Sequence, residues 1–193
     1  MIKNILNFPL AYKLSQKIFL ADNFRKKILK KHFSTNVERI LDVGCGPGNM
    51  VDNLSFKEYF GFDTDKKYIN YAKKKYDECN FFCEKFSIAS IKKIKKVDLV
   101  LLFGLLHHLS DEEVNELIST IVLSVKNEFK ILVLDPVFVE NQNPVAKFLI
   151  ENDRGLFVRN SSGYLKLFNK QKLNYKYNIY NQKIVPYTWI VTE

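Results

Sequence analysis

The chain has 193 residues, of which 47% are hydrophobic and 14% aromatic, a composition that fits one globular domain and excludes general disorder. Its longest uncharged apolar stretch, residues 99–106, is much shorter than the ~20 residues of a membrane-spanning helix. Asn7, Pro9 and Lys13 interrupt any apolar run near the start, so we expect no secretory signal, no membrane segment and a cytoplasmic location.

The net charge and the cysteine content exclude fewer classes of protein than the composition does. The net charge is +9, but 26 of the 30 basic residues are Lys, a compositional bias that does not by itself indicate nucleic-acid binding. The chain has an odd number of cysteines, and their spacing is not that of a disulfide framework or a zinc site. They are Cys45, Cys79 and Cys83. We therefore expect reduced thiols and no metal.

Apolar runs alternate with helical patterns through the first two thirds of the chain, which is typical of a parallel sheet covered by helices. The helical patterns cover residues 66–76 and 110–126, the second beginning at a Ser110 cap. The predicted strands are residues 39–43, 58–62, 80–84, 97–103 and 130–135.

After Asp135 the rhythm changes. Two predicted helices, 144–152 and 161–169, precede two strand-like runs, 173–180 and 184–192, which are too close for a crossover helix and should pair as an antiparallel hairpin. We expect a single domain over 1–193, in three parts: a helical lid over 1–35, broken at Pro9, a core over 36–135, and helices with the terminal hairpin over 136–193.

The stretch ILDVGCGPGN, residues 40–49, places three of the seven glycines directly after a predicted strand. Glycine permits positive φ and close approach of the backbone to a ligand. The pattern departs from the dinucleotide motif G-x-G-x-x-G because Asn49 occupies the sixth position, and it lacks the Gly-Lys-Ser/Thr of a nucleotide-triphosphate loop. Asp63, about twenty residues further on at the end of the second strand, is placed to bind ribose hydroxyls.

With ILDVGCGPGN, GFDTD and VDLVLLFGLLHHLSDEE, the sequence resembles the class I S-adenosylmethionine-dependent methyltransferases over nearly its whole length. The resemblance implies a Rossmann-like α/β fold, with a mostly parallel seven-stranded sheet, an antiparallel C-terminal hairpin and helices on both faces. It also implies S-adenosylmethionine as cofactor and S-adenosylhomocysteine as product.

Carried over to this chain, the resemblance places the glycines around the methionine part of the cofactor, Asp42 at its ammonium group, and Asp63 and Thr64 at the ribose and adenine. Glu84 or Lys85 replaces the usual Asp at the adenine, with Phe86 packing beside it. The full set of expected cofactor residues is Asp42, Gly44, Cys45, Gly46, Gly48, Asp63, Thr64, Glu84, Lys85, Phe86, Phe103 and Gly104.

Acceptor residues are expected after the fourth and fifth strands and in the lid. His107 and His108 follow the fourth strand, where His107 is a candidate general base, although both residues could instead cap and pack the next helix. Arg154 and Arg159 are two of only four arginines, and a guanidinium fork fits an anionic or sugar-like acceptor or a local ion pair. The remaining candidates are Tyr12, Gln16, Asn143 and Tyr164.

The absence of Asn-Pro-Pro-Tyr and Cys-Pro motifs disfavours amino-group and C5-pyrimidine methylases and leaves a small-molecule acceptor as the preferred interpretation. The methyl group would then pass directly to an acceptor held in line. Two alternatives remain open: a regulatory protein that binds the cofactor without turnover, and an RNA or DNA methyltransferase that uses the basic N-terminal arm.

Overall fold

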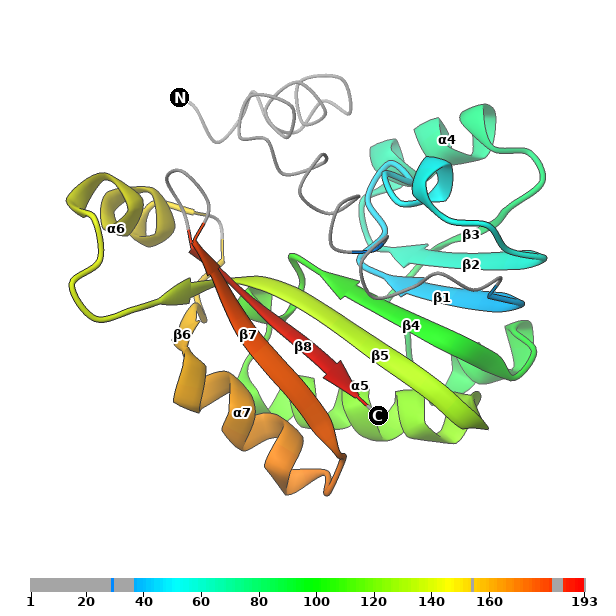
Figure 1. Ribbon diagram of the computed structural model, residues 1–193. Helices are drawn as coiled ribbons and strands as arrows, with labels where there is room; N and C mark the ends of the chain where they lie inside the picture. The colour runs from blue at the N-terminus through cyan, green and yellow to red at the C-terminus, as the bar shows by residue number, and fades with distance from the viewer. Residues whose placement is uncertain (1–28, 30–36, 154, 182–185, 193) are drawn as a thin grey trace. The chain divides into compact units, whose positions relative to one another are not determined.

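The computed structural model describes residue 29 and residues 37–153, 155–181 and 186–192 (Figure 1). The chain divides into two compact units, Met1–Lys85 and Phe86–Glu193, and each is described by itself below. The lid predicted over residues 1–35 lies outside the described residues, apart from the buried Leu29.

In the first unit, three parallel strands form a sheet in the order β3-β2-β1. Side chains such as Ile40, Tyr59 and Phe62 fill its core. The strands are β1 (Arg39–Val43), β2 (Glu58–Asp63) and β3 (Asn80–Cys83), and the short helix η1 (Val51–Asn53) lies between β1 and β2 in sequence.

Helix α4 (Lys66–Lys75) packs on β2 and β3 in this unit. It begins at Asp65, whose carboxylate accepts hydrogen bonds from the backbone N–H groups of Lys67 and Tyr68 and so satisfies two free donors of the first turn. The spacing of Ile69 and Ala72 puts both side chains on the buried face. The helix thereby fixes the strand-to-helix turn that follows Asp63.

The second unit contains a further sheet segment. Strand β4 (Val97–Phe103) pairs in parallel with β5 (Val125–Phe138). Strand β8 (Pro186–Thr192) is antiparallel both to β5 and to β7 (Tyr175–Asn181), and the two-residue β6 (Arg159–Asn160) pairs in parallel with the end of β5. The helical elements are η2 (Ile88–Lys93), η3 (Leu106–His108), α5 (Asp111–Ser124), α6 (Pro144–Glu151) and α7 (Ser161–Lys170).

The predicted elements are confirmed with small shifts in their ends, and the antiparallel hairpin forms as β7 and β8. Two predictions are wrong in detail. Helix α5 ends at Ser124 instead of about Lys126, and the strand predicted over 130–135 runs from Val125 to Phe138. The polar first half of this strand, β5, looks like a turn in the sequence. In the structure that half extends the pairing of β5 with β4 across a register shift. Strand β6 was not predicted, because only its pairing with β5 defines it.

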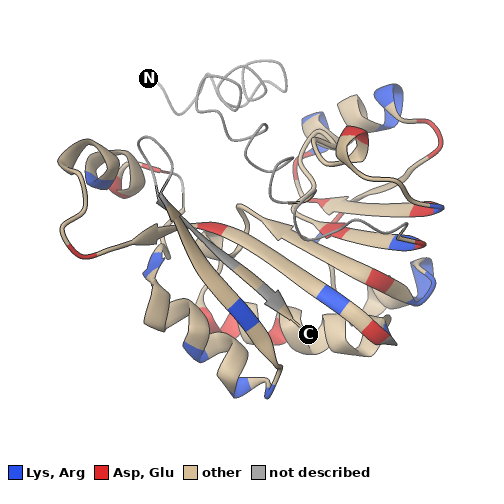
Figure 2. Cartoon of the chain, in the orientation of Figure 1, with Lys and Arg blue, Asp and Glu red and all other residues tan. Residues whose placement is uncertain are grey.

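Basic and acidic residues occur along both units (Figure 2). Helix α4 ends in Lys73, Lys74 and Lys75, whereas α5 begins with three acidic residues, and both arrangements complement the helix dipole. No helix among the described residues is long and apolar enough to cross a membrane.

Candidate functional site

The glycine-rich turn after β1 requires glycine. Gly44, Gly46 and Gly48 have φ values of 76°, 54° and 79°, a left-handed conformation that side chains with a Cβ adopt at a cost. The turn closes on β2, since the backbone N–H groups of Gly44 and Cys45 donate to the Phe62 carbonyl oxygen at 2.8 and 3.1 Å. The peptide groups of this turn are therefore held in a fixed arrangement.

Asp63, at the end of β2, fastens the turn. Its Oδ2 accepts the N–H of Gly46 at 2.9 Å, and its Oδ1 accepts the N–H of Asp65 at 2.8 Å. Burial raises the pKa of this carboxyl, and the backbone donors partly offset that rise by stabilising the charged form. A carboxylate has about four acceptor positions, so Asp63 has capacity left to accept a ribose hydroxyl while it holds Gly46.

Asp42 is buried beneath the turn, with 2% of its surface exposed. Its carboxylate accepts the hydroxyl proton of the fully buried Tyr59. Burial, with the nearby Asp42, holds the pKa of Tyr59 well above its usual value, so the phenol keeps its proton. Cys45 is also buried, and burial raises the pKa of its thiol well above the usual value. Cys45 is accordingly an inert thiol in the turn.

The other expected cofactor residues lie in two places. In the first unit, the Thr64 carbonyl accepts the Cys83 thiol with Sγ 3.8 Å away, and Glu84 is half-buried while Lys85 is exposed. In the second unit, Phe86 and Phe103 are buried. Gly104 has a φ of 66°, and its N–H donates to the Leu134 carbonyl oxygen at 2.8 Å, which turns the chain from β4 towards η3.

His107, in η3, is nearly buried between two carboxylates. Its Nδ1 lies 2.5 Å from Oδ1 of Asp135, and its Nε2 lies 3.2 Å from Oδ2 of Asp153. Burial opposes the positive charge, but hydrogen bonds to Asp135 and Asp153 outweigh it and raise the pKa of His107 to about 9. In this arrangement both ring nitrogens donate, so no lone pair is available for a general base. The ring of the exposed His108 lies 4.0 Å from that of His107, centroid to centroid.

Arg159 uses its whole guanidinium fork within the protein. Nε and Nη2 donate to Oδ1 of Asp111 at 2.9 and 2.7 Å. Nη1 donates to the carbonyl oxygens of Leu106 and Phe157, both at 2.9 Å, and Nη2 to that of Leu109 at 2.8 Å. These five bonds match the five N–H donors of Arg, so the geometry favours the local ion pair over binding of an acceptor.

Tyr164 and Asn143 also have contacts within the protein in place of the acceptor contacts expected from the sequence. Tyr164 is fully buried, and its hydroxyl donates to the Pro136 carbonyl oxygen at 3.0 Å. The Asn143 side chain caps α6 by accepting the N–H groups of Val145 and Ala146 at 2.8 and 3.3 Å. Tyr12, Gln16 and Arg154 lie outside the described residues.

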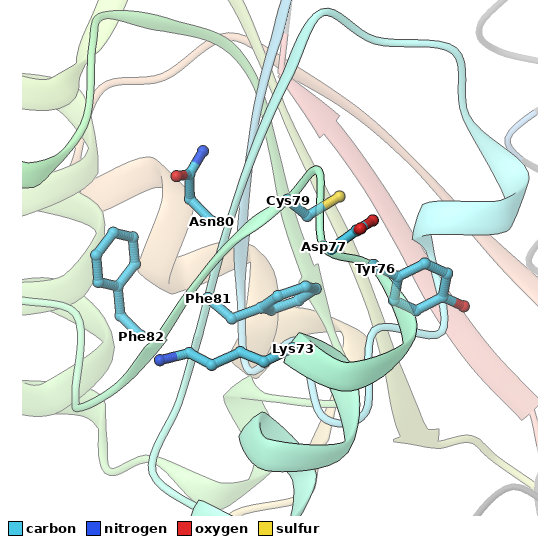
Figure 3. Close-up of a pocket in the computed structure, with 7 residues that line it drawn as sticks. All are labelled: Lys73, Tyr76, Asp77, Cys79, Asn80, Phe81 and Phe82. Atoms are coloured by element: carbon cyan, nitrogen blue, oxygen red, sulfur yellow. The ribbon is translucent and has the colours of Figure 1, made fainter.

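A pocket of about 360 Å³ opens beside α4 and β3 in the first unit (Figure 3). In Figure 3 the Lys73 side chain extends towards Phe82, while the ring of Phe81 points towards Tyr76. The Phe81 and Tyr76 ring centroids are 6.4 Å apart. No expected cofactor residue lines this pocket; its lining residues are Lys73, Tyr76, Asp77, Cys79, Asn80, Phe81 and Phe82.

Sequence reasoning missed three residues of these sites: Tyr59, Asp135 and Asp153. Asp135 had a usable signal, because it follows the apolar run ILVL near the carboxyl end of a parallel strand, where ligands of α/β sheets gather. Asp153 had none, since only the folded loop brings it to His107. Asp135 and Asp153 face opposite edges of the ring and do not converge on one point; the described residues hold no cluster suited to a metal ion.

The sequence of residues 40–128 matches the family model of a methyltransferase domain. This range includes the glycine-rich turn, Asp63 and His107. No curated protein matches the chain by sequence.

Solved structures extend the likeness to nearly the whole chain. A S-adenosylmethionine-dependent methyltransferase from Leishmania major has a TM-score of 0.70 at 12% identity, covering 98% of this chain and 78% of its own. Human N-acetylserotonin methyltransferase, solved with S-adenosylmethionine, has a TM-score of 0.68 at 16% identity, covering 98% of this chain and 57% of its own. The mitomycin 7-O-methyltransferase MmcR has a TM-score of 0.64 at 16% identity, covering 81% of this chain and 49% of its own.

Residues 40–128 thus resemble a methyltransferase domain, and the chain shares the fold of the S-adenosylmethionine-dependent methyltransferases among these structures. The Rossmann-like fold predicted from the sequence, mostly parallel with an antiparallel C-terminal hairpin, is confirmed. The chain spans only about half the length of the mitomycin enzyme and under three fifths of the human one.

Proposed function

We propose that this protein binds S-adenosylmethionine at the glycine-rich turn and directs its methyl group to a small-molecule acceptor. The observation that carries the proposal is the turn itself: three left-handed glycines fastened through Gly46 to the carboxylate of Asp63. When bound, the cofactor supplies a methyl group already activated on a sulfonium sulfur.

The residues of the turn fit this cofactor by their chemistry. The bare glycine backbone allows close approach of the methionine part, and the carboxylate of Asp63 has acceptor capacity left for a ribose hydroxyl. Asp42 would supply the negative charge for the ammonium group, and the Tyr59 hydroxyl bond fixes the orientation of that carboxylate. Glu84, Lys85, Thr64 and Phe86 remain candidates for the adenine.

The small-molecule acceptor is supported by the names of the similar structures. Two are named for the compounds they methylate, mitomycin and N-acetylserotonin, and a third is a plantazolicin methyltransferase solved with a triazolic desmethylPZN analogue. With an activated methyl group, the protein's main tasks are to align the acceptor and exclude water, and such alignment can contribute ~7 to 11 kcal/mol.

The state of His107 bears on which acceptors the protein can use. Because its pKa is raised to about 9, His107 is protonated near neutral pH, where it donates hydrogen bonds to both carboxylates and is not placed to remove a proton. An acceptor that is already ionised near neutral pH, or an amine that is unprotonated there, needs no base to expose its lone pair. We therefore propose such acceptors ahead of alcohols, for which His107 would first have to lose a proton and its bond to Asp153.

The experiment is a calorimetric titration of S-adenosylhomocysteine into the wild-type protein and the variant Asp63→Ala. We expect the variant to bind ~10- to 150-fold more weakly, the equivalent of ~1.5 to 3 kcal/mol for hydrogen bonds to a charged group. The control is Asp77→Asn, which removes an exposed carboxylate of the same unit and should bind like wild type. Melting curves of both variants separate a lost contact from a lost fold.

Equal affinity of wild type and Asp63→Ala would refute the assignment of the site. Tight binding of S-adenosylmethionine without methylation of any compound in a broad acceptor panel would instead favour a regulatory protein. Salt-sensitive binding of RNA or DNA would favour a nucleic-acid methyltransferase, because phosphate contacts release counterions.

A further inference from the structure

The loop between α6 and β6 lies directly on η3. The N–H of Phe157 donates to the His107 carbonyl oxygen at 2.9 Å. Gly155 is so close that a Cβ there would stand 2.0 Å from Cδ2 of the His107 ring. This loop also carries Asp153, whose carboxylate reaches the outer nitrogen of that ring.

The two carboxylates that flank His107 differ in kind. Asp135 is fully buried, and besides the ring Nδ1 it accepts the backbone N–H groups of Leu106 and His107 at 3.3 and 3.1 Å. Asp135 belongs to β5, and these bonds fix η3 to that strand. The side chain of Asp153 is 40% exposed, and its distance to the ring nitrogen is longer, at 3.2 Å.

The net charge of the group explains what the outer position accepts. The charge of Asp135 balances that of the imidazolium, so the pair has no net charge. The Nε2–H is nevertheless the donor of a cationic ring, and it points away from Asp135. Charge-assisted hydrogen bonds to carboxylates are stronger than bonds between neutral groups. A carboxylate therefore suits this position better than an alcohol or an amide does.

We propose that the Nε2–H of His107 is the recognition point for a carboxylate group on the acceptor, and that Asp153 occupies it as an internal substitute which such an acid displaces. The acceptor would be an organic acid with an apolar body, because the same loop exposes Leu156 (86%) and Phe157 (39%). The role of this acid as methyl acceptor rests on the proposed function, but its binding requires neither the cofactor nor methyl transfer.

A tethered carboxylate competes with a free one. The observed dissociation constant of an acid is its intrinsic value divided by the fraction of molecules in which Asp153 has left the ring. If Asp153 is in place nine times in ten or more, removing its charge tightens acid binding at least tenfold. In the structure Asp153 is in place against the ring.

The test is a calorimetric titration of benzoate at pH 7 into cofactor-free protein. We expect Asp153→Asn to bind benzoate at least tenfold more tightly than wild type, and the double variant with His107→Gln to lose that gain. Glu151→Gln is the matched control: it removes an exposed carboxylate of α6, two residues away, and should bind like wild type. Benzamide, the neutral analogue of benzoate, should bind Asp153→Asn no better than wild type.

A second measurement uses the wild-type chain alone. Saturating benzoate should speed amide hydrogen exchange in residues 155–157, because the displaced loop loses its bonds to η3. The proposal is refuted if Asp153→Asn gains no affinity for benzoate, if benzamide gains equally, or if exchange in the wild-type loop is unchanged. These outcomes are independent of S-adenosylhomocysteine binding, so either proposal can fail while the other stands.

Discussion

Replacing Arg159 by Ala should cost stability by releasing the chain after α6 from η3 and from the start of α5. The guanidinium joins three backbone carbonyl oxygens and the Asp111 carboxylate at 2.7 to 2.9 Å. Its side chain is only 10% exposed, whereas that of Asp111 is 57% exposed. The bonds to the carbonyl groups are therefore the better shielded part of the interaction.

The magnitude follows from this arrangement. Three bonds to carbonyl oxygens contribute ~1 kcal/mol each, and the exposed pair with Asp111 adds at most ~1 kcal/mol. The expected loss for Arg159→Ala is ~3 to 4 kcal/mol in the free energy of unfolding, or a fall in melting temperature of ~6 to 16 °C for a chain of this size. The melting temperature of Arg159→Lys should lie between those of wild type and Arg159→Ala, because an ammonium has three donors and no planar fork.

Thermal denaturation followed by circular dichroism measures this effect. Lys147→Ala is the control, since it removes a cation with one exposed partner, Glu151, at 3.9 Å, and it should melt within ~2 °C of wild type. If Arg159→Ala also melts within ~2 °C of wild type, the structural role is wrong. A normal melting temperature with impaired methylation would return Arg159 to the role of binding an anionic acceptor.

Two further predictions concern pH and the glycine turn. The pKa of His107 is raised to about 9 in the folded chain from 6.5 in the unfolded one, so its ion pairs stabilise the fold fully below pH ~6 and lose this effect as the pH rises through 9. Urea unfolding from pH 6 to 9.5 should show this decline in wild type and a flatter profile in His107→Gln; identical profiles would contradict the ion pairs. Gly48→Ala should lower the free energy of unfolding by ~1 to 3 kcal/mol, because φ is 79° there and the new Cβ would stand 2.9 Å from Cε2 of Tyr76. Urea denaturation checks this value, and an unchanged midpoint would mean that the turn tolerates a side chain.

The glycine-rich turn and its neighbour Asp63 could be located from the sequence because their signals are local. An apolar strand leads directly into the turn of residues 44–48, whose three glycines adopt the left-handed backbone conformation that favours glycine. The strand and the glycines lie within ten residues of one another. Asp63 follows at the spacing that one strand–turn–strand repeat imposes. In the same way, the Ser110 cap with Glu113 marked the start of α5, and the short gap before β8 fixed an antiparallel hairpin.

The surroundings of the residues expected to bind the acceptor depend on contacts that no local pattern contains. Arg159 looked like a ligand because its residue type is rare in this chain, yet its partners lie 48 to 53 residues earlier in η3 and α5, apart from the nearby Phe157. His107 looked like a base, yet Asp135 is 28 residues away along the chain, and Asp153 reaches it from another loop.

Sequence by itself thus determined the elements and the glycine turn, because hydrophobic period, capping and backbone φ are set by neighbouring residues. Only the tertiary structure decided the charge state of His107 and the partners of Arg159. A titratable or hydrogen-bonding group takes its role from the dipoles and charges within a few ångströms, and folding brings these from distant positions.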